Sequence, residues 1–430
     1  MRHPSKMPSL VYADSEGRIY DLPELKMAGR SGRLLHPVDL KDLIPLPEGS
    51  ELFVLPDRLP VGWDQDRDDM VVLDEDPGNA KGKVRAVAAF MAPAYTQTAL
   101  AAFHRSSSDI PPLPLFTYTA VGWWKGHFWT AGFRSDPDIR QNFCNFRPEE
   151  VRKKTIAMLK KNKENRLIQH LGRCSLTYGC PAAKNLFLGR WEAPLPTSPI
   201  CNAACLGCIS LQSEGVPPAS QDRITFVPTA EEVAGVAVPH LNMAQRPVVS
   251  FGQGCEGEPL LQAKLLERSV IKIREETDKG TINLNTNASL PGKVQNLISA
   301  GLDSIRISMN STRKEYYHAY FRPKGYDQND VLASWRIMKE AGRFVSINLF
   351  VLPGLTDEMA EIDRLSDLIQ ELGLDLIQLR NHSIDPDWYL DGIGYEYTGH
   401  RTGIISMVTI LKKRFPKLRF GYFNPYLRSD

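Results

Sequence analysis

From about residue 190 onwards, short apolar runs alternate with amphipathic helical patterns. Apolar runs that end in polar residues are typical of strands buried on both faces of a parallel sheet, with a helix after each strand. The runs that we expect to be strands are RPVVSFGQG (246–254), GTINLNTNAS (280–289), DSIRISMN (303–310), FVSINLFVLPG (344–354) and DLIQLRN (375–381). With a strand just before Cys201, the pattern predicts an α/β fold, namely a partial (β/α)6 TIM-like barrel over residues 191–430 that ends in a helix and a strand. In such folds the chemistry collects at the carboxyl ends of the strands.

The first 190 residues show a different pattern. Short strand-like pieces such as ELFVLP and VRAVAAFMA are separated by Asp and Gly turns, which predicts an N-terminal α+β domain over residues 1–190. Residues 151–172, VRKKTIAMLKKNKENRLIQHLG, are expected to form one amphipathic helix with a solvated, lysine-rich face. We expect this domain to act as an accessory or substrate domain.

Composition excludes several classes of protein. The chain has 430 residues and a net charge of +2, which argues against nucleic acid or an anionic membrane as a partner. No apolar run approaches the ~18 residues that span a bilayer, and the N-terminal residues lack the apolar segment of a secretory signal, so we expect a cytoplasmic location. Seven cysteines in such a chain favour metal ligands or reactive thiols over a disulfide framework.

Three of these cysteines stand close together in PTSPICNAACLGCISLQ, namely Cys201, Cys205 and Cys208 in the spacing C-x3-C-x2-C. Three thiols can hold zinc, copper(I) or an iron–sulfur cluster. A structural zinc site needs a nearby fourth ligand, and the next histidine downstream, His240, lies far beyond Cys208. A [4Fe–4S] cluster held by three cysteines leaves one iron open for a cofactor. The alternative is a zinc ribbon, or buried thiols in an unrelated α/β domain.

This arrangement, a C-x3-C-x2-C motif directly after the first strand of a (β/α)6 array, resembles the radical S-adenosylmethionine (SAM) superfamily, and in particular its molybdenum-cofactor-cyclase and peptide-maturase branch. The resemblance implies that Cys201, Cys205 and Cys208 hold a [4Fe–4S] cluster whose open iron binds SAM. One electron, from a donor such as flavodoxin or ferredoxin, then cleaves SAM to a 5′-deoxyadenosyl radical that abstracts hydrogen from a substrate. The cofactors carry the difficult chemistry, while the protein orients them and excludes water.

Further motifs in order along the chain support this resemblance. GCEGEPLL is similar to the family's Gly-Gly-Glu-Pro element, with Glu256 in place of the first Gly. NTNAS, RISMNS and YFRPKG are similar to segments that follow the third and fourth strands of the family. The residues that the resemblance assigns to SAM binding are Gly257, Glu258, Asn287, Ser308, Asn310 and Arg322.

Four cysteines remain outside this motif, namely Cys144, Cys174, Cys180 and Cys255. Four thiols match the number that a second, auxiliary [4Fe–4S] cluster needs, and such a cluster would be built by the N-terminal domain reaching over the barrel. Two alternatives are inert buried thiols, or a catalytic Cys255 that donates or receives a hydrogen atom. In IDPDWYL, Asp385, Asp387 and Tyr389 are expected on the active-site side, where they either touch substrate or are exposed loop residues.

The sequence is less informative about the substrate. A peptide or protein is our first expectation, because the N-terminal domain is large for the lid of a small-molecule site. A small metabolite, lipid or nucleoside is the next candidate, and the balanced charge disfavours RNA. The competing class is a non-catalytic metal-binding scaffold that keeps the barrel.

Overall fold

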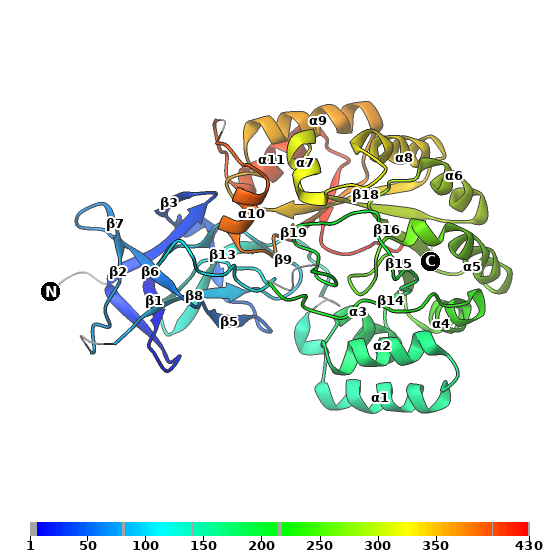
Figure 1. Ribbon diagram of the computed structural model, residues 1–430, viewed down its shortest axis with the longest axis horizontal. Helices are drawn as coiled ribbons and strands as arrows, with labels where there is room; N and C mark the ends of the chain where they lie inside the picture. Colours follow the sequence, from blue (N-terminus) through cyan, green and yellow to red (C-terminus); the bar gives the residue numbers. More distant parts are fainter. Residues whose placement is uncertain (1–6, 80–81, 140–141, 213–216, 398, 429–430) are drawn as a thin grey trace.

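The computed structural model describes residues 7–428 except 80–81, 140–141, 213–216 and 398, and in this part of the chain the strands form two sheets. A parallel sheet carries the second half of the chain, and a mainly antiparallel sheet carries the first. The arrowheads of the parallel strands point towards the N-terminal sheet, so this sheet lies at the carboxyl ends of the parallel strands (Figure 1).

The parallel sheet follows the chain in strict order from β14 to β20, and every neighbouring pair is parallel. Its strands are β14 (Glu192–Pro194), β15 (Val248–Phe251), β16 (Thr281–Thr286), β17 (Ser304–Met309), β18 (Phe344–Val351), β19 (Leu376–Asn381) and β20 (Arg419–Gly421). The predicted strands therefore formed where the apolar runs placed them. The predicted α/β fold class, a partial TIM-like barrel, is confirmed.

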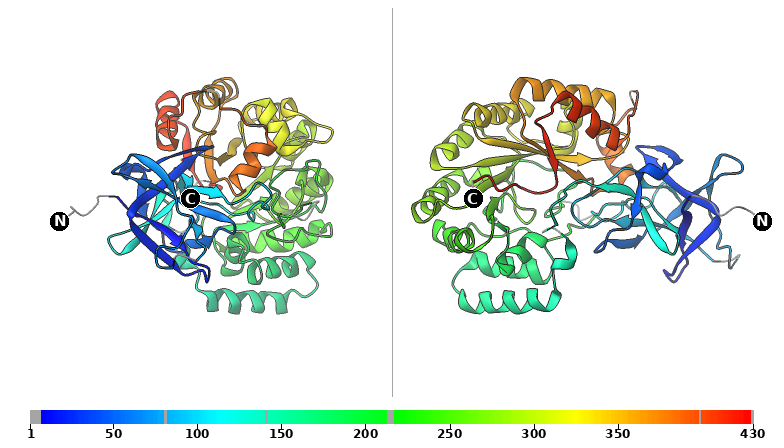
Figure 2. Two further views of the ribbon diagram at one scale, coloured as in Figure 1. Left: turned by 60° about the vertical axis from the view of Figure 1, so that its left-hand side comes forward. Right: turned by 180° about the vertical axis from the view of Figure 1, so that it is seen from behind.

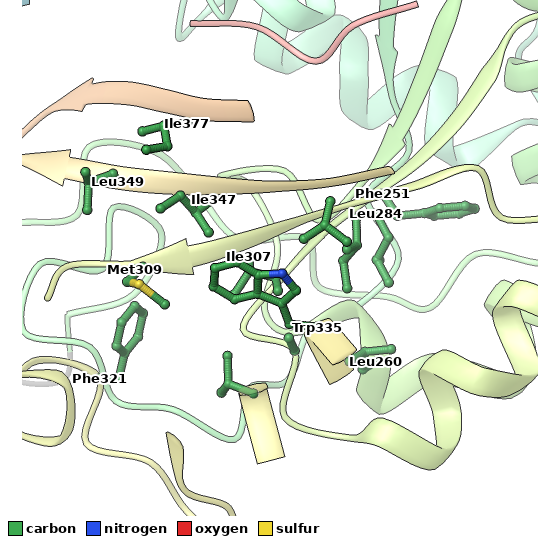
Figure 3. Packing of buried hydrophobic residues seen from close by; sticks show 14 of the residues in the cluster. Phe251, Leu260, Leu284, Ile307, Met309, Phe321, Trp335, Ile347, Leu349 and Ile377 are labelled. Carbon is green, nitrogen blue, oxygen red and sulfur yellow. The ribbon is translucent and has the colours of Figure 1, made fainter. Parts of the chain in front are cut away.

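Helices follow the strands of this sheet, and most of them cover its outer face. They are α4 (Ala230–Met243), η4 (Pro259–Gln262), α5 (Ala263–Glu276), α6 (Pro291–Ala300), α7 (Lys314–Phe321), α8 (Gln328–Glu340), α9 (Met359–Leu372), α10 (Pro386–Gly392) and α11 (Ile404–Arg414). Of these, α10 lies beside the N-terminal sheet (Figure 1). Trp335 of α8 is fully buried between Ile307 and Ile347 of the sheet and other apolar side chains (Figure 3). Its indole N–H donates a hydrogen bond to the backbone oxygen of Gly373, which satisfies the one polar atom of the side chain.

The N-terminal sheet is built from short strands joined by tight turns. They are β1 (Ser9–Ala13), β2 (Ile19–Ser31), β3 (Leu34–Pro37), β4 (Leu43–Pro45), β5 (Glu51–Val54), β6 (Arg58–Asp64), β7 (Asp69–Val72), β8 (Arg85–Phe90), β9 (Tyr95–Gln97), β10 (Leu100–Ala101), β11 (Phe103–Arg105), β12 (Val121–Trp124) and β13 (His127–Arg134). Short 3-10 turns stand at η1 (Leu40–Asp42) and η3 (Phe143–Asn145). Several small apolar clusters fill its interior in place of one large core.

The single helix that we predicted over residues 151–172 is wrong. The segment forms α1 (Pro148–Lys161) and α2 (Arg166–Leu176), because the Asn165 side chain caps α2 by accepting a hydrogen bond from the backbone N–H of Ile168. A third helix, α3 (Pro181–Leu188), follows at once. Leu167 and Leu171 belong to the same apolar core as the barrel. Helix α2 packs against α4 and α3 against β14, while α1 lies on the outer side of α2 (Figures 1 and 2).

Buried polar contacts join the N-terminal sheet to the barrel. The backbone N–H of Gln97 in β9 donates to Asn381 Oδ1 at the end of β19, and Asn381 Nδ2 donates in return to the backbone oxygen of Tyr95. Arg58 of β6 forms an ion pair with Asp385, and both side chains are at most 3% exposed. The N-terminal sheet is therefore fixed against the end of the barrel where the chemistry is expected. None of the helices in the described residues is long and apolar enough to cross a membrane.

Candidate active site

A cavity of about 480 Å³ lies at the carboxyl ends of the parallel strands. Its volume is in the range of small-molecule sites, roughly 300–1,000 Å³. Loops and strand ends of the barrel form most of its wall, and the N-terminal sheet completes it through Phe90, Met91, Pro93 and Thr117. The cavity is therefore shared between the two sheets.

The three motif cysteines all line this cavity. Their loop is held from behind by the end of α7, because the backbone N–H groups of Ala204 and Leu206 donate to the carbonyl oxygens of Phe321 and Tyr320. The guanidinium of Arg223 donates to Cys208 Sγ at 3.3 Å. A cationic donor at this distance stabilises a thiolate, which is the form that binds metal.

Burial favours the protonated form of two thiols of this loop, Cys201 and Cys205. Burial raises the pKa of the Cys201 thiol to about 11 and raises the pKa of Cys205 well above its ordinary value. Metal binding must therefore release protons here. Three converging thiols with no fourth protein ligand among the described residues fit an iron–sulfur cluster with one open iron better than a closed zinc site.

Gly257 brings the loop after β15 against the cysteine loop. A Cβ at this position would lie 2.0 Å from the backbone oxygen of Ile200, so only glycine fits. The backbone N–H of Gly257 donates to Ser198 at 2.6 Å, and that of Glu258 donates to Ile200 at 2.9 Å. The motif residue Gly257 is thus explained by a close contact between two backbones.

Glu256 connects the same two loops from inside the protein. Its Oε2 accepts hydrogen bonds from the backbone N–H groups of Thr197 and Ser198, and its Oε1 accepts from those of Gly252 and Gln253. The side chain is only 5% exposed, and burial raises its pKa to about 7. This acid, which replaces the first glycine of the expected motif, fixes the start of the cysteine loop to the end of β15.

Glu258 is bound to the end of β16. Its carboxylate accepts hydrogen bonds from the Thr286 hydroxyl, from the backbone N–H of Asn287 at 2.8 Å and from that of Leu260 at 2.9 Å. Burial raises its pKa to about 7. The side chain lines the cavity and orients the strand end beside it.

The structure brings together most of the residues assigned to SAM, but not all of them. Asn287 and Ser308 line the cavity with Gly257 and Glu258. Asn310 is buried outside the lining, where its amide N–H groups donate to the Tyr316 backbone oxygen and the Tyr389 hydroxyl. Arg322 is exposed at the C-terminal end of α7 and also lies outside the lining.

Two arginines that sequence reasoning did not assign to the site point into the cavity. Arg306 of β17 donates to Gln378, and Arg380 of β19 stacks over the Tyr422 ring with its guanidinium carbon 4.0 Å from the ring centroid. Neither forms an ion pair with a carboxylate among the described residues, and the Nε of each is buried without a hydrogen-bond partner there. Burial lowers the pKa of Arg306 to about 9. The cavity therefore offers two positive charges to an anionic group.

The remaining cysteines lie outside the cavity. Cys144 is exposed in η3. Cys255 is 4% exposed. Its side chain packs with Cys174 and does not line the cavity. This placement does not support the predicted catalytic role of Cys255, although the neighbouring residues Gly254 and Glu256 do line the cavity.

Asp385, Asp387 and Tyr389 do not lie in an exposed loop. Asp385 caps α10 and pairs with Arg58, and Asp387 pairs with Arg30. Tyr389 is buried beside Asn310. The two carboxylates dock the N-terminal sheet onto the barrel. This role depends on Arg30 and Arg58, which lie far away in the sequence, so no local pattern around residue 385 could predict it.

Sequence reasoning missed Arg223 and Arg306. It noted Glu256 only as a replacement for a motif glycine and Arg380 only as a polar residue at a strand end, and it gave neither of them a role. Arg223 lies in an irregular loop beyond the cysteines, where no periodicity marks it. Arg306 and Arg380 each stand within an apolar strand pattern. A charged side chain in a buried strand is stable only beside a cavity or a polar partner, so these two charges were the feature of the sequence that indicated a site.

A thiol-lined cavity at the carboxyl ends of a partial parallel barrel is typical of iron–sulfur enzymes with an open coordination site. Residues 195–366 match the family model described as the Radical SAM superfamily. This part of the chain is therefore similar to radical SAM enzymes, a family whose members hold a [4Fe–4S] cluster and SAM.

The search of curated proteins finds no match. Among solved structures, the chain is similar to HydG, a maturase of the [FeFe]-hydrogenase (15% identity, 64% of this chain and 66% of that chain, TM-score 0.39). It is also similar to a radical SAM methyltransferase from Sphaerobacter thermophilus (16%, 53% and 64%, 0.37) and to SuiB from Streptococcus suis bound to precursor peptide SuiA (15%, 58% and 54%, 0.35). The chain thus covers less than two thirds of each of these proteins, and likenesses at this level carry no argument about its substrate.

Proposed function

We propose that Cys201, Cys205 and Cys208 bind one [4Fe–4S] cluster and that Gly257, Glu258, Asn287 and Ser308 surround the SAM bound to it. When bound, these cofactors supply a 5′-deoxyadenosyl radical by one-electron cleavage of SAM, and the radical abstracts hydrogen from the substrate. The observation that carries this proposal is that all seven residues line a single cavity.

The protein's own residues position the cofactors and keep the cavity dry. Glu256 and Glu258 fix the loops that carry the cysteines and the SAM contacts. Arg306 and Arg380 bind a carboxylate, because two half-buried guanidinium groups that form no ion pair with an acid of the described residues favour an anion. Tyr320, Phe321 and Phe350 shield the cysteines from water.

For the substrate, we favour a peptide or protein. SAM takes up a large part of a cavity of about 480 Å³, so the remaining space suits the reacting end of a substrate, such as one side chain. The N-terminal sheet supplies one wall of this space. We therefore propose that residues 1–190 select the substrate and that residues 191–430 perform the radical chemistry, with flavodoxin or ferredoxin as electron donor. A cytoplasmic location is consistent with reduced thiols.

Formation of 5′-deoxyadenosine tests the reaction. The anaerobically reconstituted protein, reduced with dithionite and supplied with SAM, should release 5′-deoxyadenosine slowly even without substrate. A variant with Cys201, Cys205 and Cys208 all changed to Ala should release none. Absence of the product from a wild-type protein that contains its cluster would refute the proposal.

Fractionation of a cell extract tests the substrate class. The extract is separated by ultrafiltration, and each fraction is added to the reduced enzyme while 5′-deoxyadenosine is measured. A peptide or protein substrate should stimulate product formation from the retained fraction, and protease treatment should remove the stimulation. Stimulation by a protease-resistant component of either fraction would instead assign a small metabolite, lipid or nucleoside.

A further inference from the structure

A second group of metal-binding side chains lies outside the cavity. One nitrogen of His170 and the sulfurs of Cys174 and Cys255 all lie within 4.8 Å of one another. His170 Nε2 is 3.6 Å from Cys174 Sγ. Cys180 packs against the small cluster of buried residues that contains Cys174, Ala183 and Cys255. No other group of three His, Cys, Asp or Glu residues in the described part of the chain is this compact.

Three elements bring these side chains together. His170 and Cys174 are four residues apart on α2 and therefore share one face of the helix. Cys180 precedes α3, and its backbone N–H donates to the backbone oxygen of Cys174 at 3.1 Å, which turns the chain back towards α2. Cys255 arrives from the loop after β15 and is held there by a hydrogen bond between its backbone oxygen and Ile224.

The donor set and its spacing suit a single ion. Three thiols and one imidazole are a ligand set of structural zinc sites, in which zinc is four-coordinate and tetrahedral. Bond lengths of about 2.3 Å to sulfur and 2.0 Å to nitrogen place neighbouring ligand atoms roughly 3.5–3.8 Å apart. The distance of 3.6 Å between His170 Nε2 and Cys174 Sγ matches that spacing, and the sulfur of Cys255 lies within 4.8 Å of Cys174 Sγ and of a His170 ring nitrogen. A [4Fe–4S] cubane would need them farther apart, because each thiolate binds a different iron.

We propose that His170, Cys174, Cys180 and Cys255 form a tetrahedral zinc site that is separate from the radical SAM cluster. This assignment differs from the auxiliary [4Fe–4S] cluster that the sequence suggested, both in the metal and in its ligands. His170 replaces Cys144, which is exposed in η3. His170, Cys174 and Cys255 form the compact group, and Cys180, which packs against it, would supply the fourth ligand.

The position of Cys255 indicates a structural role for this ion. Cys255 directly precedes Glu256, Gly257 and Glu258, which hold the cysteine loop and line the cavity. An ion bound to Cys255 would also be bound to His170 and Cys174 of α2 and to Cys180 before α3. It would therefore anchor the loop after β15 to these two helices. The zinc would therefore be structural, and it would fix the loop that binds SAM to the helices before β14.

Metal analysis of a full-length variant without the first cluster tests the proposal. The triple variant Cys201→Ala, Cys205→Ala, Cys208→Ala is purified anaerobically with a reductant, and zinc, iron and sulfide are counted. We expect one zinc per chain and no iron. Because this variant cannot cleave SAM, the result is independent of the proposed reaction.

Further changes on that background identify the ligands. Cys174→Ser and Cys255→Ser should each remove the zinc, whereas Cys144→Ser should leave it in place. Co²⁺ substitution, which needs no ligand variant to fold, should give the intense d–d bands of tetrahedral cobalt and thiolate-to-cobalt charge transfer. Four irons with sulfide in the triple variant would overturn the proposal, and so would a metal-free protein with a Cys174–Cys255 disulfide or with no Co²⁺ spectrum.

Discussion

Single residues decide the electrostatics of the cysteine loop. Within the described residues, Arg223 is the one arginine whose guanidinium donates directly to a motif sulfur. No sequence pattern marks it, because it lies in an irregular loop. The cysteines themselves were recognisable from spacing alone. The spacing of the cysteines is a local property of the sequence. The contact of Arg223 with Cys208, in contrast, depends on the conformation of the loop that brings the two residues together.

Removal of Arg223 should lower the reduction potential of the proposed cluster. Hydrogen bonds and net charge near the sulfurs set such potentials, so Arg223→Ala should shift the midpoint by tens of millivolts in the negative direction, as an order of magnitude. A redox titration followed by electron paramagnetic resonance measures the shift. Arg223→Lys keeps the charge and should shift the potential less; equal potentials in all three proteins would contradict this role.

His240 should make the protein acid-sensitive. Burial lowers the pKa of His240 to about 4, and its Nε2–H donates to the Trp191 backbone oxygen at 3.1 Å. The unfolded chain takes up a proton near pH 6.5 while the folded protein does not, so stability should fall between about pH 6.5 and pH 4 by up to about 3 kcal/mol from this residue. Urea unfolding across this range should show a shallower loss in His240→Gln, whose amide can still donate to Trp191. An unchanged slope would refute the assignment.

At the scale of elements, the strands were predictable and the breaks between helices were not. Fully buried parallel strands leave long apolar runs, which is why β15 to β19 were found from the pattern. The break between α1 and α2 depends on one asparagine cap in a polar segment, and a lysine-rich helix pattern continues across it. The sequence showed that Gly257 belongs to a motif. It did not show the backbone contact with Ile200 that requires a glycine at this position.

Gly257→Ala should separate the two loops at the cavity. The new Cβ would lie 2.0 Å from a backbone oxygen, so the backbone rather than a flexible side chain has to move. We expect at least a tenfold loss in 5′-deoxyadenosine formation, because a displacement of about 1 Å can cost 10²-fold in rate. Gly292→Ala is the matched control, since a Cβ there meets nothing within 4 Å. Equal rates for both variants would show that the loop contact does not matter.

Trp335 should be a main contributor to the stability of the barrel. Trp335→Ala would leave a cavity under the sheet and lose the hydrogen bond to Gly373, and we expect a loss of about 3–5 kcal/mol in the free energy of unfolding. Chemical denaturation measures this loss. Ile271→Ala on the exposed side of α5 should change stability by no more than about 0.5 kcal/mol. A comparable effect of both substitutions would contradict the packing argument.

At the scale of the whole molecule, the contact between the two sheets was beyond sequence reasoning. Each part could be predicted by its own periodicity, but Arg58 and Asp385 are far apart in the chain and neither belongs to a motif. The Arg58–Asp385 pair and the Arg30–Asp387 pair give both aspartates a docking role, in place of the substrate contact or exposed loop position that we expected from the sequence.

Loss of the buried ion pair should loosen the N-terminal sheet. Arg58→Met leaves the Asp385 carboxylate buried without its charged partner, which we expect to cost about 3–5 kcal/mol. Hydrogen exchange should rise in β9 and α10, where the two parts meet. Arg33→Ala removes a pair with Asp391 that is about half exposed, and it should leave exchange there unchanged. Unaltered exchange in Arg58→Met would show that other contacts suffice.

The two hydrogen bonds between the Asn381 side-chain amide and the backbone of β9 have a practical consequence for protein engineering. A chimera that joins this barrel to a foreign N-terminal region would lose the partners of both Asn381 and Gln97, and one side of the reaction chamber would be open to solvent. New specificities should therefore be sought by changing side chains around Met91 and Thr117 on the native scaffold, rather than by exchanging whole modules.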